Sequence, residues 1–357
     1  MRTQEDALDQ IDRAKPHLRT PIGETITLAH GAGGKTTAAL IDSVFLEAFG
    51  DPAVAELTDS AILEVPGGRI AYSTDSYVVN PIRFPGGSIG DLAVNGTVND
   101  LAVCGAKPQW LSAAFIIQEG LAIDELRAIA ADMKQAAVRA GVRIVTGDTK
   151  VVPRDAGDKV FITTSGIGIV PAERTLSASR VCDHDRIILS GPIAAHGMAV
   201  MIARGNLALT APIESDSAPV NHLVEALYAV LDAADVRWMR DPTRGGLGTV
   251  ANELANDCGL GILLDDDAIQ VAPSVQGACD MLGIDPLYVA NEGCFVAVVA
   301  PDQAERAVAA LREAGAPQAD IIGEVTSDLP GVVAIRNGFG GTRLVDMMAG
   351  DPLPRIC

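Results

Sequence analysis

The sequence has few basic residues, no closely paired cysteines and no long hydrophobic run. Its 27 Lys and Arg residues stand against 46 Asp and Glu residues, which gives a net charge of −19. A field of that sign repels phosphate backbones and anionic lipid headgroups, so neither nucleic acid nor a membrane surface is expected as a partner. The six cysteines include no C-x-x-C pair, which argues against a structural zinc site and a disulfide framework.

The first twenty residues mix acidic and basic side chains and contain no apolar segment typical of a signal peptide. No later run reaches transmembrane length, so we expect a cytoplasmic protein. A chain of 357 residues with 48% hydrophobic content is too long for one core of usual size, and two domains are therefore expected.

From residue 24 onward, short β-branched runs alternate with helical patterns, which predicts an α/β fold. A polar, turn-rich stretch near 171–181 predicts the boundary between two domains. Strands are expected at 25–28, 69–74, 111–117, 142–146, 160–170 and 186–190, and helices over 40–49, 88–104 and 124–140. We expect an N-terminal arm (1–24), an N-terminal domain (25–175), a C-terminal α/β domain (176–345) and a tail (346–357).

The tail contains Gly350, Pro352 and Pro354 and cannot continue a helix or a central strand. A dozen extended residues at about 3.3 Å each reach roughly 40 Å. The tail is therefore expected to be flexible and to carry the thiol of Cys357 to a site on its own chain or on a partner.

A glycine-rich segment, AHGAGGKT at 29–36, is expected to open a helix. Backbone N–H groups and a lysine, Lys35, suit phosphate binding at such a place. A P-loop is disfavoured, because Ala29 replaces its first glycine and the strand at 69–75 is only partly apolar. The alternative is a turn before a helix with a solvated lysine.

Three aspartates, Asp59, Asp75 and Asp100, stand at predicted strand ends, helix ends or turns. Carboxylate oxygens are the ligands that Mg²⁺ uses when it is shared with nucleotide phosphates. Taken singly, each is more commonly a cap or turn residue, so both interpretations stay open.

Two further glycine-bearing or charged loops follow, and the second of them suits a polyphosphate. GDTK at 147–150 follows a strand, and RDPTRGGL at 240–247 places two guanidinium groups and consecutive amides before a helix. Arg240 and Arg244 could instead pair with surface carboxylates. Glu292 precedes the apolar run 294–300 and is, by itself, a turn carboxylate.

Together these segments resemble the superfamily of aminoimidazole ribonucleotide synthetase, selenophosphate synthetase, thiamine monophosphate kinase and the hydrogenase-maturation HypE family. A selenophosphate synthetase would carry a reactive Cys or selenocysteine beside its glycine-rich segment, whereas the nearest cysteine here is Cys104. The segments that indicate HypE are HGAGGK at 30–35, STDS at 73–76, FPGG at 84–87, GDTKVV at 147–152, DPTRGG at 241–246, NEG at 291–293 and the terminal PRIC.

The resemblance implies a two-domain aminoimidazole ribonucleotide synthetase-like fold whose N-terminal domains pair in a homodimer, with ATP and Mg²⁺ as cofactors. It implies that the carbamoyltransferase HypF loads Cys357, and that ATP-dependent dehydration converts the carbamoyl group to a thiocyanate. Cyanide then passes to the NiFe-hydrogenase iron on the HypC–HypD complex. Lys150 and Glu292 are implied to remove the protons together.

The resemblance also implies which residues bind the nucleotide and the metal. Asp59, Asp75 and Asp100 are implied Mg²⁺ ligands. The implied nucleotide-binding residues are Gly33, Gly34, Lys35, Asp59, Asp75, Asp100, Gly147, Asp148, Thr149, Asp241, Thr243, Arg244, Gly245, Gly246 and Asn291.

Two other functions stay open at this point. A kinase or synthetase of the same superfamily would act on a free small molecule, and it would keep its turnover if the tail were removed. A nucleotide-sensing scaffold would bind ATP without producing ADP.

Overall fold

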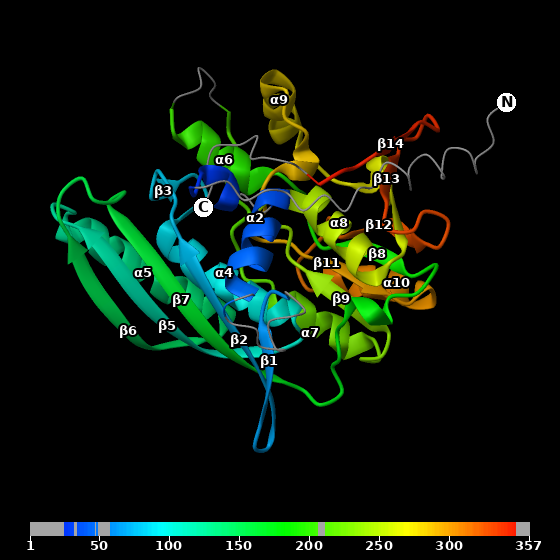
Figure 1. Cartoon of the computed structure of the whole chain (residues 1–357), viewed down its shortest axis with the longest axis horizontal. Coiled ribbons are helices and arrows are strands. Elements are labelled where there is room, and N and C mark those ends of the chain that lie inside the picture. The colour runs from blue at the N-terminus through cyan, green and yellow to red at the C-terminus, as the bar shows by residue number, and fades with distance from the viewer. Residues whose placement is uncertain (1–24, 32–33, 47, 49–57, 206–210, 348–357) are drawn as a thin grey trace.

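The computed structural model describes residues 25–31, 34–46, 48, 58–205 and 211–347 (Figure 1). The N-terminal arm, Gly33 and the part of the tail that carries Cys357 lie outside these residues. The strands form two large sheets, one on each side of the domain connection, and helices pack on both sheets (Figure 1). Two-domain α/β architecture, as predicted, is confirmed, while the exact domain limits stay predictions.

The first sheet has the strand order β1-β2-β7-β5-β6, in which only β5 and β6 run parallel. Helix α4 packs against β2, β5 and β7, and α5 packs against α4 and β6. The elements are β1 (Ala61–Val65), β2 (Gly68–Tyr77), α4 (Ile89–Val103), β5 (Lys107–Gln118), α5 (Ile123–Ala140), β6 (Arg143–Val152) and β7 (Val160–Val170).

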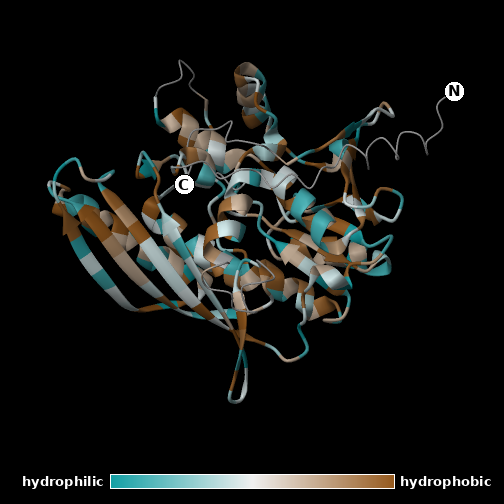
Figure 2. Ribbon diagram, viewed as in Figure 1, coloured by the Kyte–Doolittle hydropathy of each residue, from teal (hydrophilic) through white to brown (hydrophobic). Residues whose placement is uncertain are grey.

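Among the described residues, helices cover one face of this sheet. Along β7, every second residue from Val160 to Val170 is buried while the residues between are not, as expected for a strand with one buried face. The opposite face, here called the outer face, exposes large apolar side chains, and hydrophobic stretches run along its strands (Figure 2). Among them, Tyr72, Trp110, Ile116 and Ile169 are 42%, 40%, 43% and 44% exposed.

Helix α4 lies between the two domains and is enclosed on nearly every side. All but two of its residues are buried, which is the pattern of a helix enclosed by protein. Ser88 caps its first turn, and the Asp91 side chain returns to the Ser88 backbone, completing a capping box. Helix α5 ends at Gly141, whose φ of 70° is the left-handed conformation common after a helix.

The second sheet has the order β14-β13-β10-β12-β8-β11-β9. Strand β8 sends Ile187 and Leu189 into one core and Ile188 into another, so both faces are covered. Helices α6, α8 and α9 contribute to the first core, and α7 and α10 to the second. The elements are β8 (Arg186–Leu189), α6 (Ala195–Ala203), α7 (Asn221–Val230), β9 (Val236–Arg240), α8 (Gly246–Cys258), β10 (Gly261–Asp265), α9 (Pro273–Leu282), β11 (Val296–Val299), α10 (Ala304–Glu313), β12 (Asp320–Thr326), β13 (Val333–Arg336) and β14 (Thr342–Leu344).

Most predicted elements occur near their predicted positions, but one prediction near the N-terminus is wrong. The strand expected at 25–28 is absent, and a short 3-10 helix, η1 (Leu28–Gly31), follows instead. Ile26 and Leu28 are 72% and 78% exposed, so this β-branched run has no sheet to join. The glycine-rich segment opens a helix as expected, α2 (Lys35–Leu40), which continues as a π-helical turn, η2 (Ile41–Leu46), into the region 40–49 where helix was predicted.

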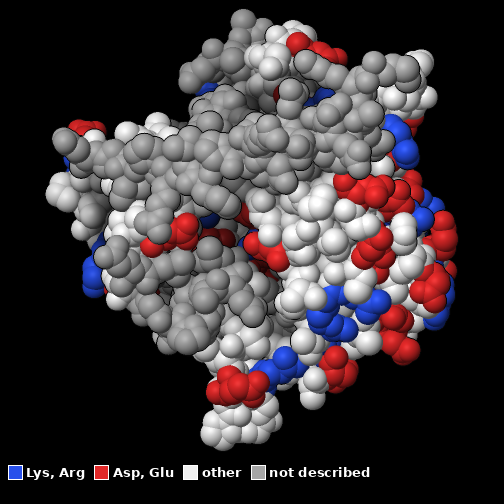
Figure 3. Space-filling model, turned by 45° about the vertical axis from the view of Figure 1, so that its right-hand side comes forward, with Lys and Arg blue, Asp and Glu red and all other residues white. Residues whose placement is uncertain are grey.

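Over the C-terminal domain, acidic and basic side chains lie intermixed on the face in Figure 3. Within the described ranges, no helix combines the length and the apolar character needed to cross a bilayer.

Candidate functional site

Four carboxylates from both domains meet at the domain junction. Asp59 precedes β1, Asp75 lies on β2, Asp100 on α4, and Asp241 follows β9. Burial raises the pKa of each carboxyl group, and the other carboxylates of the group raise the pKa of all but Asp59 further. The three aspartates predicted as metal ligands are thus brought together, and Asp241, predicted only as a nucleotide ligand, joins them.

Few protein groups offset this negative charge. Arg240 donates from Nε to Asp59 Oδ1 at 2.8 Å and from Nη1 to Glu253 Oε2 at 2.8 Å. The hydroxyl of Ser73 donates to Asp100 Oδ2 at 2.7 Å, and that of Tyr77 to Asp75 Oδ2 at 3.2 Å. Arg240 therefore pairs with carboxylates, as the alternative interpretation expects, but one of its partners, Asp59, belongs to this site.

The donor set fits a hard cation. All four groups are buried carboxylates, and a bound cation would offset the repulsion among them. As the side chains stand, no three acidic, histidine or cysteine groups in the described ranges are arranged to hold a metal ion. The fit therefore rests on the chemistry and burial of the donors.

The loop 241–246 forms the C-terminal wall of the site. Gly245 and Gly246 have φ of 77° and 61°, and a Cβ on Gly246 would lie 2.5 Å from the Leu287 carbonyl oxygen. These glycines let the loop turn sharply into α8. Arg244 donates from Nη1 to the Gly31 carbonyl at 3.4 Å, which links this loop to the glycine-rich segment.

A small cavity of about 30 Å³ lies between this loop and residues of the N-terminal domain. It is lined by Asp75, Ser76, Tyr77, Gly96, Asp100, Asp241, Thr243, Arg244 and Glu292. Glu292 is only 4% exposed, and its charge raises the pKa of the Tyr77 hydroxyl together with Asp75 and Asp100. The predicted base thus faces the predicted metal ligands, although the two are far apart in the sequence.

Two predicted nucleotide ligands have other contacts here. Lys35 lies 3.3 Å from the Asp346 carboxylate at the start of the tail, on the surface. Asn291 is fully buried, and its side chain accepts from the Ala194 N–H and donates to the Pro242 and Val289 carbonyls. Asn291 therefore fixes the loop beside Asp241. The roles of both residues as nucleotide ligands stay predictions.

The segment 147–150 lies apart from the junction. It belongs to β6, the exposed edge strand of the first sheet. Asp75 aligns with Thr164, Ala113 and Gly147 across the sheet, so β6 is three strand spacings from β2, roughly 14 Å at about 4.8 Å each.

Lys150 also lies on the opposite face of the sheet from Asp75. It pairs in register with Ile116, whose side chain is exposed on the outer face, whereas Asp75 faces the covered side near Asp100. The Lys150 side chain is 72% exposed and its ammonium lies 3.2 Å from Asp148. A single chain therefore does not bring Lys150 to Glu292.

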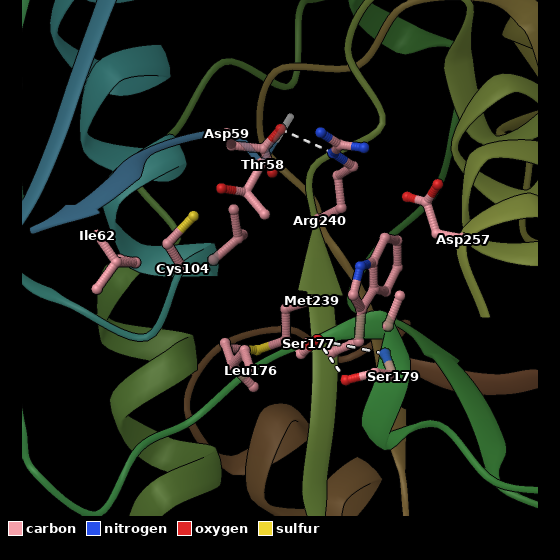
Figure 4. Close-up of a pocket in the computed structure, with 13 residues that line it drawn as sticks. Thr58, Asp59, Ile62, Cys104, Leu176, Ser177, Ser179, Met239, Arg240 and Asp257 are labelled. Carbon is pink, nitrogen blue, oxygen red and sulfur yellow. Dashed lines mark hydrogen bonds and ion pairs between the residues drawn. The ribbon is translucent and has the colours of Figure 1, made fainter. Parts of the chain in front are cut away.

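A second cavity, of about 310 Å³, lies on the other side of the Asp59–Arg240 pair (Figure 4). Figure 4 shows this ion pair at one end and Cys104, Leu176 and Met239 along the wall. Burial raises the pKa of the Cys104 thiol. The cavity belongs to the junction but contains none of the other three aspartates.

Comparisons with known proteins agree with this architecture. Family models described as the N-terminal and C-terminal domains of AIR synthase related protein match residues 57–170 and 183–335. Carbamoyl dehydratase HypE of Rhodobacter capsulatus is 49% identical over 340 residues, covering 94% of this chain and 98% of that protein.

Solved structures are similar as well. A crystal structure of a HypE–HypF complex has a TM-score of 0.82 at 43% identity and covers 87% of this chain and all (100%) of that chain. A crystal structure of hydrogenase maturation protein HypE in complex with ATP has a TM-score of 0.77 at 45% identity, covering 93% and 100%.

Proposed function

Because the chain belongs to the HypE family of carbamoyl dehydratases, we propose that it uses ATP to dehydrate a carbamoyl group carried on the sulfur of Cys357. The product is a thiocyanate that supplies cyanide to the iron of a NiFe-hydrogenase. The observation that carries the proposal is the meeting of Asp75, Asp100, Asp241 and Glu292 around one small cavity, which provides anionic groups for Mg²⁺–ATP and a carboxylate for proton removal.

The reaction balances without a further reactant. The carbamoyl oxygen takes the terminal phosphoryl group of ATP, and the C–O bond then breaks, so the oxygen leaves in inorganic phosphate. The nitrogen loses two protons as the C≡N bond forms. Phosphorylation is needed because an amide oxygen is otherwise a poor leaving group.

Glu292 is placed to accept a proton. It is buried at the cavity wall, and a buried carboxylate held near its substrate serves as a general base. Arg244, on the opposite wall, supplies a positive charge beside Asp75 and suits the phosphates.

Mg²⁺ would be held by Asp59, Asp75 and Asp100, and Asp241 adds a fourth carboxylate. Bound there, the ion would neutralise charge on the transferring phosphoryl group. Arg240 keeps Asp59 in place through the 2.8 Å contact.

A homodimer formed through the outer face accounts for the position of Lys150. The outer face exposes apolar side chains such as Trp110 and Ile169, and exposed apolar patches of this kind mark protein interfaces. Edge strand β6 borders that face. In the dimer, residues 147–150 of one subunit reach the junction of the other, where Lys150 can meet Glu292 and ATP.

The tail is the expected carrier of the substrate. Its first residue and the residue before it are fixed to the C-terminal domain, since Tyr288 donates to the Asp346 carbonyl at 2.8 Å and Asn252 to the Val345 carbonyl at 3.0 Å. Burial raises the thiol pKa values of Cys104, Cys258, Cys279 and Cys294, which makes these cysteines poor nucleophiles. In the cytoplasm, Cys357 would receive its carbamoyl group from HypF and donate cyanide to HypC–HypD.

Intact mass spectrometry tests substrate, site and reaction together. The chain is incubated with the carbamoyltransferase, carbamoyl phosphate and ATP. A mass gain of about 43 Da followed by an ATP-dependent loss of about 18 Da is expected for a thiolate-linked intermediate. With ¹⁸O in the carbamoyl oxygen, the label should leave in inorganic phosphate.

Cys357→Ala should show neither mass change, whereas Cys182→Ala, which removes an exposed cysteine, should show both. Carbamoylation mapped to another cysteine would contradict the proposal. Phosphorylation of a free small molecule by Cys357→Ala, with ADP formed from ATP, would identify a kinase instead. ATP binding by loaded protein without ADP formation would identify a nucleotide sensor.

A further inference from the structure

A segment that no motif marks contacts both domains beside Glu292. Residues 211–220, here called the strap, connect to helix α7 of the C-terminal domain. The Ser215 N–H donates to the Pro85 carbonyl at 2.8 Å, and Ser217 Oγ accepts from Asn95 on α4 at 3.1 Å. The strap therefore lies against the N-terminal domain although it belongs to the other one.

Asp216, within the strap, holds the peptide groups on both sides of Glu292. Its carboxylate accepts from the Glu292 N–H, at 3.3 Å to Oδ1 and 3.2 Å to Oδ2, and from the Gly293 N–H at 3.1 Å to Oδ2. A Cβ on Gly293 would lie 1.8 Å from the Asp216 carbonyl oxygen. The turn carrying Glu292 thus packs directly on Asp216.

The Glu292 carbonyl is held as well, from the other domain. Asn99 on α4 donates from Nδ2 to the Glu292 carbonyl at 3.3 Å and to the Ala218 carbonyl at 3.0 Å. The Ala218 N–H also donates to the Glu292 carbonyl at 3.3 Å, and Asn99 Oδ1 accepts from the Val220 N–H at 2.8 Å. Asn99 therefore ties together α4, the strap and the Glu292 turn.

Keeping a charged Asp216 here costs stability. Burial raises the pKa of its carboxyl group to about 6, although the amide donors oppose the shift. The folded-state pKa lies above the unfolded value, so the stability linked to this group is complete below pH 3.8 and is lost as the pH rises through about 6. At pH 8 the carboxylate is ionised, and a residue selected for stability alone would be neutral.

We propose that Asp216 and Asn99 are positioning residues, which fix the backbone of Glu292 from two domains so that its carboxylate points into the small cavity. The inference rests on the proposed role of Glu292 as the base. Asn99 precedes Asp100 on the same helix. Its contact with the Glu292 carbonyl would therefore also fix the base relative to the Asp100 carboxylate.

The test compares single-turnover dehydration by full-length protein loaded with the carbamoyl group, at pH 8. Asp216→Asn keeps the size of the side chain and removes its charge. Its dehydration rate should fall about tenfold to a hundredfold, because small displacements of a reacting group are costly. Carbamoyl loading and Mg²⁺–ATP affinity should not change, and the protein should unfold at the same or a higher temperature than wild type.

Ser217→Ala is the matched control, because it removes a strap contact to α4 that does not involve Glu292. It should keep the wild-type dehydration rate. In the Glu292→Gln background, followed over hours, adding Asp216→Asn should cause no further loss, because a residue acting through Glu292 has nothing left to position.

The outcomes separate this inference from the proposed function. A wild-type rate in Glu292→Gln would overturn the role of Glu292 itself. A wild-type rate in Asp216→Asn, or an equal loss with and without the Glu292 carboxylate, would overturn the positioning role while leaving Glu292 as the base. A lower unfolding temperature with weakened Mg²⁺–ATP binding in Asp216→Asn would also overturn it, by showing a general structural defect.

Discussion

The two parts of the predicted site differ in completeness. At the domain junction, Asp75, Asp100, Asp241 and Glu292 line one cavity within a single chain. On β6, the Lys150 side chain is 72% exposed and pairs with Asp148. The sequence motifs predict that both parts belong to one site, but a single chain brings together only the residues of the first part. This difference is why we propose that residues 147–150 act at the junction of a partner subunit in a homodimer.

Loss of the base should have the largest effect. Glu292→Gln should still be loaded on Cys357, because the partner enzyme performs that step, but dehydration should slow about 10²- to 10⁴-fold. Mass spectrometry of loaded protein measures both steps. Glu214→Gln, at an exposed position on the strap, is the control and should dehydrate at the wild-type rate. Normal dehydration by Glu292→Gln would show that Glu292 is not the base.

A mixture of two inactive variants tests the comparison directly. If Lys150 and Glu292 come from different subunits, a heterodimer of Lys150→Ala and Glu292→Gln contains one intact site. Random mixing in equal amounts makes about half of the dimers mixed, so about a quarter of the wild-type dehydration activity should return. Each variant alone should stay inactive.

As a control for subunit exchange, each variant is also mixed with the wild-type protein. No recovery, despite exchange shown by mass-tagged subunits, would mean that the two residues belong to one chain's site or never meet.

Much of the fold could be predicted from the sequence, because the signals are local. The alternating run at 160–170 became β7 with the same limits, and Gly141 ends α5 where predicted. Strand β1 was missed, since AILEV is short and only partly buried. The site could be predicted only in part: Asp75, Asp100 and Asp241 are recognisable as motif residues, but their meeting depends on how two domains pack.

Two other features of the site had no local signal. The exposure of Lys150 follows from the strand order and from the side of β6 on which it lies, and the GDTK motif predicts neither. Asp216 lies in a strap without regular secondary structure, and its contacts with Glu292 span 76 positions. Sequence patterns of short range cannot show such contacts.

The junction carboxylates should lower the stability of the fold and strengthen the binding of Mg²⁺–ATP. Burial raises the pKa of Asp241 above its value of 3.8 in an unfolded chain, so its contribution to stability is complete at low pH and is lost as the pH rises through the folded-state pKa. At pH 8, Asp241→Asn should therefore unfold at a higher temperature without nucleotide and bind Mg²⁺–ATP about tenfold more weakly.

Thermal unfolding with and without Mg²⁺–ATP measures both changes. Asp232→Asn, at an exposed position, should match wild type in each condition. If Asp241→Asn lowers the unfolding temperature without nucleotide, the carboxylate is instead needed for the fold of the junction.

The smallest effect is expected at the glycine-rich segment. Like β6, this segment is exposed, and its Lys35 lies beside the start of the tail. Lys35 and Asp346 are 43% and 81% exposed, and such surface pairs contribute about 0–1 kcal/mol. Asp346→Asn should therefore leave thermal unfolding unchanged. It should strengthen Mg²⁺–ATP binding, by about fivefold at most, because Lys35 is released to meet the phosphates. Titration calorimetry against Asp266→Asn, an exposed control, measures the change. Weaker binding by Asp346→Asn would show that the pair itself forms part of the nucleotide site, and that the start of the tail closes over it.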